Sequence, residues 1–224
     1  MKISIITLFP SMFDGPFATS MLKKAQDNNL LQIELVDLRQ FGIGPRKTVD
    51  DTPYGGGAGM VLKPEPIFTA VEQAKKNLSN AKVILMSPRG AKYTQNIAKS
   101  LAKQNDLIII CGHYEGVDER VSKIVDEEIS IGDFILTGGE IAAMALVDSV
   151  ARLIPGVLGH KDSAADESFS SGILEYPQYT RPDEFEGMKV PEELKTGDHA
   201  KIEQWRKAQA VEKTKQNRPD LIDF

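Results

Sequence analysis

Short apolar segments alternate with amphipathic ones through most of the chain. Segments rich in β-branched or apolar residues predict buried strands at 2–8, 32–37, 82–86, 106–111 and, more briefly, 127–130. Apolar residues recur at helical spacing in 11–26, after Pro64, after Thr94 and in 138–154. Strands that alternate with helices are typical of an α/β fold, here a parallel sheet with helices on both faces. The segment 106–111 is the most apolar strand, so we expect it at the centre of the sheet.

Two long segments lack hydrophobic periodicity. The first, 38–59, is rich in Gly, Pro and Asp and predicts a loop; since loops of this length are uncommon unless they cover a site, it indicates function. The second, 156–172, is rich in Gly, Ser, Ala and Asp and predicts a flexible linker. Beyond it, Asp198 can cap a helix that reaches about Asn217. We therefore expect an α/β domain at 1–158, a flexible linker at 159–172 and a small, mainly helical domain at 173–224.

The composition is that of a folded globular protein. Of the 224 residues, 41% are hydrophobic and 26% are charged. The single cysteine, Cys111, cannot form an intrachain disulfide, and the N-terminal residues show no signal-peptide pattern, so we expect a cytoplasmic protein. The longest apolar run is too short to cross a bilayer, which indicates no membrane role. The net charge of -5 provides no general attraction to nucleic acid, so contact with RNA would require a local group of Lys and Arg.

Three short loops with glycine follow predicted strands: SPRG at 87–90, CGHYEG at 111–116 and IGDFILTGGE at 131–140. Ligands of open α/β sheets bind beyond the carboxyl ends of the strands, and glycine lets the backbone approach a flat ligand closely. One such loop alone would be read as an ordinary turn, but three together indicate a ligand site. The glycine patterns that hold dinucleotides or nucleoside triphosphates are missing, and so are zinc-ligand spacing and a serine-hydrolase motif.

These loops, together with LFPSMF, TVDDTPYGGGAGM, ARLIPGVLG and ESFSSGILEYPQYTRP, closely resemble the bacterial tRNA (guanine-N1)-methyltransferases. The resemblance spans nearly the whole chain. Members of this family belong to the SPOUT class, in which a deep C-terminal trefoil knot of the α/β domain forms the pocket for S-adenosyl-L-methionine and two chains build each active site. The resemblance therefore implies a homodimer that acts on tRNA, methylating N1 of guanosine-37 beside the anticodon. The family also suggests a magnesium requirement.

The resemblance assigns contacts with S-adenosyl-L-methionine to the three loops. The residues concerned are Ser87, Pro88, Gly112, Tyr114, Glu115, Ile131, Gly132, Asp133, Phe134, Ile135, Leu136, Gly138 and Gly139. Backbone contacts should dominate there. A Cβ added at Gly112 or Gly139 should therefore clash with the ligand or with the knot backbone.

The expected reaction needs a cation and a base, because guanine N1 carries a proton and negative charge builds toward O6 as that proton leaves. Arg152 matches the family's cation, although an Arg just before a helix stop commonly serves the helix dipole instead. The family's catalytic aspartate aligns with Glu167, one methylene longer, and Asp166 lies beside it. Either carboxylate could be the base, while the residues alone would favour solvated linker charges.

The last part of the chain carries the expected RNA-binding residues. Lys and Arg outnumber Glu on the helix after Asp198 and on its tail, giving a local basic surface that includes Lys201, Arg206 and Lys207. Tyr179 and Arg181 could stack on RNA or pair with it. The alternatives are a solvated amphipathic helix and a rigid proline turn. Two rival functions stay open at this point, a nicotinamide-dependent oxidoreductase and a non-catalytic RNA-binding protein.

Overall fold

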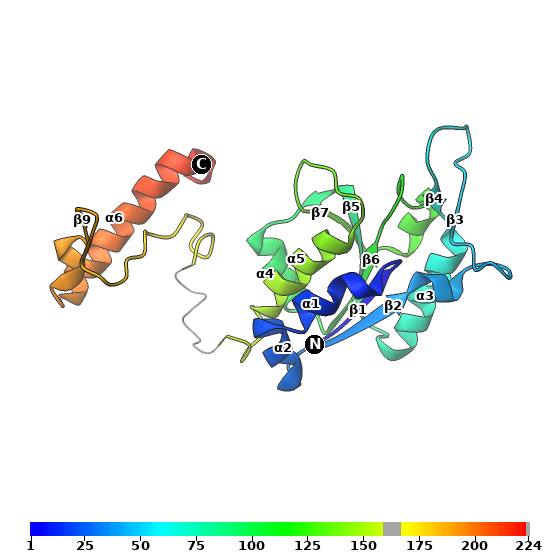
Figure 1. Ribbon diagram of the computed structural model, residues 1–224, viewed down its shortest axis with the longest axis horizontal. Helices are drawn as coiled ribbons and strands as arrows, with labels where there is room; N and C mark the ends of the chain where they lie inside the picture. Colours follow the sequence, from blue (N-terminus) through cyan, green and yellow to red (C-terminus); the bar gives the residue numbers. More distant parts are fainter. Residues whose placement is uncertain (159–166, 223–224) are drawn as a thin grey trace. The chain divides into compact units, whose positions relative to one another are not determined.

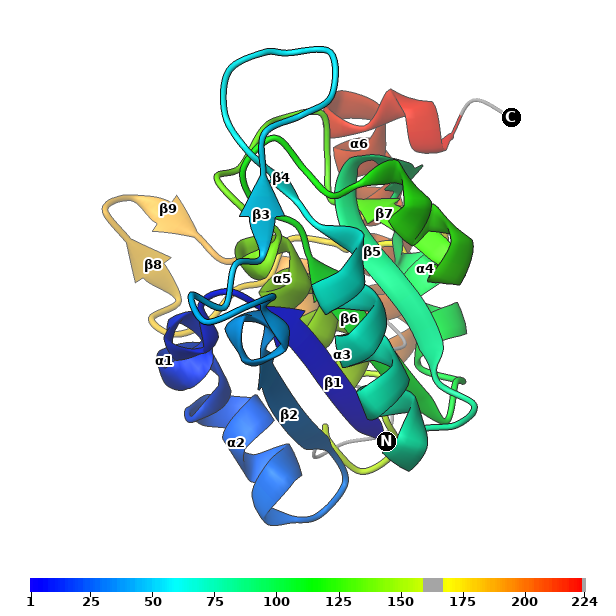
Figure 2. The same cartoon turned by 90° about the vertical axis from the view of Figure 1, so that its right-hand side faces the viewer.

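In this computed structural model, which describes residues 1–158 and 167–222, five strands form one parallel sheet (Figures 1 and 2). The strands are β1 (Lys2–Thr7), β2 (Gln32–Asp37), β5 (Lys82–Lys92), β6 (Asp106–Cys111) and β7 (Glu127–Ser130), in the order β2-β1-β6-β5-β7. β6 pairs in parallel with β1 on one side and with β5 on the other. The most apolar segment therefore does lie at the centre of the sheet, as predicted.

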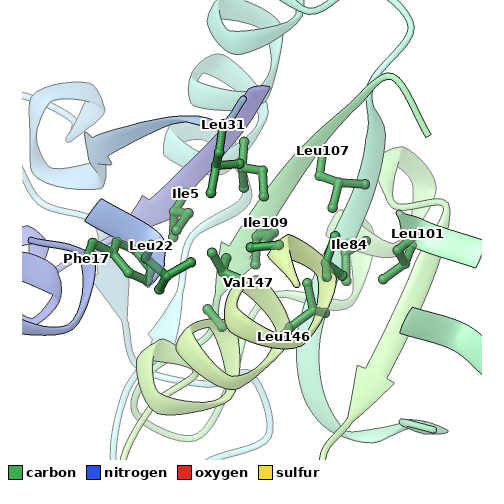
Figure 3. Packing of buried hydrophobic residues seen from close by; sticks show 14 of the residues in the cluster. Ile5, Phe17, Leu22, Leu31, Ile84, Leu101, Leu107, Ile109, Leu146 and Val147 are labelled. Carbon is green, nitrogen blue, oxygen red and sulfur yellow. The ribbon is translucent and has the colours of Figure 1, made fainter. Parts of the chain in front are cut away.

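Helices cover both faces of the sheet. One face packs against α1 (Asp14–Phe17), α2 (Ser20–Asp27), α4 (Gln95–Leu101) and α5 (Glu140–Ala151). The other face packs against α3 (Pro64–Asn77) and the short helix η2 (Leu38–Phe41). Alternate residues of one strand serve the two cores: Ile5 packs in the core with α5 (Figure 3), and Ile6 packs in the core with α3. Burial on both faces explains why these strands are continuous apolar runs.

Two predicted elements differ from the structure. The helix expected at 11–26 is broken into η1 (Pro10–Phe13), α1 and α2, because Thr19 is extended and interrupts the helical hydrogen bonds. The SPRG segment is not a loop after a strand but part of β5. Its residues lie at a shift of register, since both Met86 and Ala91 pair with Ile129 of β7.

The segment predicted as a long loop is mostly irregular. It contains η2, one isolated bridge between Ile43 and Thr48, and the two-residue strand β3 (Asp50–Asp51), which pairs with β4 (Val61–Leu62). The turn between β3 and β4 projects from the sheet, and Tyr54 in it is fully exposed (Figure 1). Beyond it, η3 (Glu119–Ile124) follows the loop after β6.

Contacts divide the chain into two compact units, Met1–Gly159 and His160–Phe224. The second unit contains the hairpin β8 (Glu184–Phe185) and β9 (Met188–Lys189), the short helices η4 (Glu192–Lys195) and η5 (Pro219–Leu221), and the long helix α6 (His199–Asn217). Asp198 caps α6, as predicted, by accepting hydrogen bonds from two backbone N–H groups at 3.1 and 3.2 Å. Among the described residues, no helix has both the length and the apolar character needed to cross a membrane.

Candidate active site

A cavity of about 380 Å³ lies beside the register shift of β5 and at the carboxyl ends of β6 and β7. Twelve of the thirteen residues predicted to hold a cofactor line it: Ser87, Pro88, Gly112, Tyr114, Glu115, Ile131, Gly132, Phe134, Ile135, Leu136, Gly138 and Gly139. Asp133 is the exception. Its side chain is 90% exposed and one carboxylate oxygen lies 3.6 Å from Nζ of Lys92. The structure thus brings together the SPRG segment of β5 and two loops that lie far from it in the sequence. The volume of the cavity is in the size range of small-molecule sites.

Close backbone contact explains the glycines of these loops. The N–H of Gly139 donates to the carbonyl of Gly112 at 2.8 Å. A Cβ on Gly139 would lie only 2.9 Å from Cα of Cys111, closer than real packing allows. A Cβ on Gly112, in contrast, would lie 3.6 Å or more from the nearest protein atom. The expected clash at Gly112 with the protein backbone is therefore wrong, because that side of the glycine is open.

Sequence reasoning missed several residues of the cavity and its floor. His113 lines the cavity, but only its neighbours Gly112 and Tyr114 were predicted to contact the ligand. Glu140, the first residue of α5, is only 2% exposed and accepts a hydrogen bond from Oγ1 of Thr7 at 2.8 Å. No local pattern signals this contact, since the two residues are 133 positions apart. Arg89 also lines the cavity, and its hydrogen bond with Glu119 raises its pKa.

The thiol of Cys111 is buried beside the cavity. Burial raises its pKa well above the ordinary value, and the nearby carboxyl group of Glu140 raises it further. A thiol held in its neutral form is a poor nucleophile, so Cys111 serves packing. Within the described ranges, no group of three or more His, Cys, Asp or Glu residues is placed to hold a metal ion.

The expected catalytic residues belong to different parts of the chain. Arg152 is the C-cap of α5, and its backbone N–H donates to the carbonyl of Asp148 at 3.2 Å. It does not line the cavity. Glu167 lies in the second unit, where its carbonyl accepts a hydrogen bond from Ser170 at 3.0 Å. Asp166 lies outside the described residues.

The predicted RNA-binding residues surround α6 in the second unit. The guanidinium carbon of Arg206 stands 4.7 Å from the ring centre of Tyr176, and the ring of Tyr179 lies 6.2 Å from that of Trp205. Arg181 is exposed, in the segment that precedes β8. Nζ of Lys201 lies 3.7 Å from Asp198, and Nζ of Lys207 lies 2.7 Å from Glu203. The Glu203 carboxylate raises the pKa of Lys207.

Comparison with known proteins identifies the family. The sequence pattern described as tRNA (Guanine-1)-methyltransferase TrmD matches residues 1–224. The tRNA (guanine-N(1)-)-methyltransferase of Dictyoglomus turgidum is 58% identical over 223 residues, covering 100% of this chain and 90% of that protein. The protein of the same name from Geobacillus kaustophilus is 56% identical over 224 residues, covering 100% and 92%.

A solved structure agrees with these sequence matches. The crystal structure of tRNA (m1G37) methyltransferase from Aquifex aeolicus superposes with a TM-score of 0.81 and 44% identity, over 99% of this chain and 94% of that one. The resemblance inferred from the glycine loops is thereby confirmed. This chain belongs to the TrmD family of tRNA (guanine-N1)-methyltransferases.

Proposed function

We propose that this enzyme transfers a methyl group from S-adenosyl-L-methionine to N1 of guanosine-37 in tRNA, in the cytoplasm, giving N1-methylguanosine. The glycine-lined cavity carries the proposal, since its backbone groups and apolar side chains suit an adenosine joined to an amino acid. The name of the Aquifex aeolicus enzyme specifies m1G37, which supports the position. When bound, the donor supplies a methyl group carried on a positively charged sulfur.

The residues of the chain supply proton transfer and charge stabilisation. A bond forms between guanine N1 and the methyl carbon as the sulfur–carbon bond breaks, and the N1 proton passes to a carboxylate. Glu167 or Asp166 is proposed as that base. The guanidinium of Arg152 is proposed to hydrogen-bond O6, where negative charge develops. The magnesium requirement that the family suggests stays a prediction; within the described ranges, no group of three or more His, Cys, Asp or Glu residues is placed to hold the ion.

The length of α5 supports an active site shared between two chains. Glu140 begins α5 beside the cavity and Arg152 caps its other end. At 1.5 Å per residue, about 18 Å of helix separates the two, too far for Arg152 to serve the cavity of its own chain. We propose that the enzyme is a homodimer in which Arg152 of one chain reaches the methyl donor held by the other.

Exposed apolar side chains beside the cavity support the same proposal. Phe134, Ile135 and Ile141 are 54%, 81% and 49% exposed, and the first two line the cavity mouth. Apolar groups clustered at a site are typical of a surface that a partner covers.

We also propose that the segments around Gly112 and Gly139, which contact each other closely, belong to a deep trefoil knot.

A complementation experiment tests the shared site. Gly112→Ala impairs the cavity and Arg152→Ala removes the cation, so each parent dimer should be inactive at low donor concentration. In coexpressed mixed dimers, one of the two sites keeps both an intact cavity and an intact Arg152. Random pairing should restore about a quarter of the wild-type rate, since C2 dimers have two equivalent sites. A mixture as inactive as its parents, or an active monomer by light scattering, contradicts the proposal.

Substitution of the two candidate bases separates their roles. Glu167→Gln should lower kcat by about 10²- to 10⁴-fold, because the amide cannot accept the N1 proton. Asp166→Asn, a matched removal of charge at the next position, should leave kcat within about threefold of wild type if Glu167 is the base. Single-turnover rates at saturating tRNA measure both. The reverse pattern assigns the role to Asp166.

Salt dependence tests the proposed RNA surface on α6. Lys207→Ala should weaken tRNA binding and reduce the slope of log K against log salt concentration by about 0.7–0.9, the loss of one phosphate contact. Lys23→Ala is the matched control, because Lys23 on α2 forms an i,i+4 ion pair with Asp27 at 2.7 Å, as Lys207 does with Glu203. If Lys207→Ala and Lys23→Ala gave equal slopes of log K against log salt concentration, Lys207 would not contact the RNA.

Mass spectrometry of nucleosides and mapped fragments after incubation with tRNA tests the whole proposal. N1-methylguanosine should form at position 37 and require S-adenosyl-L-methionine. Methylation elsewhere overturns the assigned position. Binding of NADH in place of S-adenosylhomocysteine would favour an oxidoreductase, and tRNA binding without methyl transfer would favour a non-catalytic RNA-binding protein.

A further inference from the structure

A buried carboxyl group lies under the candidate active site and has no role in the chemistry described above. Glu140 is 2% exposed and Thr7 is fully buried, and the hydrogen bond between them joins the end of β1 to the start of α5. Burial of a carboxyl group is unfavourable unless polar groups compensate for the lost contacts with water. Burying an apolar residue in the same space would cost less free energy, which indicates a specific role for Glu140.

The nearest polar neighbour of this carboxyl group in the cavity wall is His113. Nδ1 of His113 lies 4.0 Å from Oε2 of Glu140. In the described part of the chain, that nitrogen is one of only three buried side-chain polar atoms without a hydrogen-bond partner. The separation exceeds the 2.7–3.2 Å of a hydrogen bond by about 1 Å. A small movement of the ring or of the carboxyl group would therefore satisfy it.

Two aromatic rings and Gly138 surround His113. Its ring packs against Phe9 and Tyr114, with ring centres 4.9 and 4.8 Å away. A Cβ on Gly138 would overlap both Nδ1 of His113 and Oε2 of Glu140, so only glycine leaves the path between them open. The backbones of His113 and Gly138 also form an antiparallel bridge. The histidine and the carboxyl group thus lie where the two loops of the cavity wall already meet through their backbones.

We propose that Glu140 is a positioning residue: when the methyl donor fills the cavity, Nδ1–H of His113 donates a hydrogen bond to Oε2 of Glu140 and closes the two bridged loops more tightly on the ligand. Thr7 holds the carboxyl group in place through its other oxygen. The proposal rests on the proposed function, because the donor is what closes the loops. It assigns no proton transfer to His113 or Glu140.

Nuclear magnetic resonance of the enzyme with ¹⁵N-labelled histidine tests the hydrogen bond directly. Titration with S-adenosylhomocysteine should slow exchange of one imidazole N–H proton and move its signal downfield. The signal should be absent in His113→Gln, which assigns it among the three histidines of the chain. Binding with no change in that signal overturns the inference while leaving the proposed function intact. Absence of binding to the wild-type enzyme overturns both.

A double-mutant cycle, measured by calorimetry with S-adenosylhomocysteine, tests the coupling. Glu140→Ala and His113→Ala should each weaken binding on the order of tenfold, and the double variant should bind no more weakly than either single variant. Glu140→Gln keeps an acceptor and should restore most of the affinity. Additive losses, or no rescue by Gln, would show that the two residues act separately.

Two variants of β1 keep the test decisive if Glu140→Ala fails to fold. Thr7→Val removes the hydroxyl that holds Glu140 and should weaken binding by about threefold or more. Ser4→Ala is the matched control, because Ser4 is equally buried in the same strand and its Oγ has no hydrogen-bond partner among the described residues. The control should bind as wild type does. Equal affinities for the two variants would overturn the positioning role.

Discussion

Replacement of Arg152 by alanine is expected to lower kcat for methyl transfer by about 10²- to 10³-fold, the usual loss when one donor to a developing oxyanion is removed. The affinity for S-adenosylhomocysteine should stay within about twofold, because Arg152 does not line the cavity. Single-turnover kinetics and calorimetry measure the two quantities on the same preparation.

Arg152→Lys separates chemistry from helix stability. Arg152 is the C-cap of α5, where a positive charge stabilises the helix by about 0.3–1 kcal/mol. Lysine keeps that charge but cannot offer the planar fork of donors, so it should keep the wild-type Tm and still lose most of kcat. If Arg152→Lys were fully active, methyl transfer would require a positive charge at position 152 but not the planar guanidinium. Parallel losses of kcat and of ligand affinity in Arg152→Ala would indicate structural damage instead.

The second large effect is expected at Gly139. Its Cβ would lie 2.9 Å from Cα of Cys111, 3.0 Å from the backbone N of Gly112 and 3.1 Å from Cβ of Met86. Because backbone atoms of the central strand cannot yield, Gly139→Ala should reduce the free energy of unfolding by about 1–3 kcal/mol. Thermal unfolding should show a fall in Tm of about 2–4 °C for each kcal/mol.

Gly112→Ala is the matched comparison. Its Cβ would make only ordinary contacts with the protein, so Tm should remain close to that of wild type. The added methyl group would occupy space beside the cavity, and affinity for S-adenosylhomocysteine should fall by about tenfold or more. If Gly139→Ala kept the wild-type Tm, the close approach of the two loops would be refuted. Unchanged affinity in Gly112→Ala would place the ligand elsewhere.

Local sequence patterns determined most of the elements. β6 is central because it is the most apolar segment, and α6 begins where Asp198 can cap it. Such features depend on neighbouring residues alone, so periodicity and capping rules find them. The break of the helix at Thr19 and the continuation of β5 through SPRG escaped these rules, because pairing with a distant strand and packing against the sheet overrode local preference.

The sequence by itself determined the family, the α/β fold and the three glycine-containing segments of the site, because each is written in contiguous residues. Only the tertiary structure decided that Gly139 is needed for backbone contact and Gly112 is not, and that Glu140 lies beside His113. The hydrogen bond that holds Glu140 in place joins it to Thr7, 133 positions away. The geometry of such contacts depends on strand order, which no local pattern of side chains encodes.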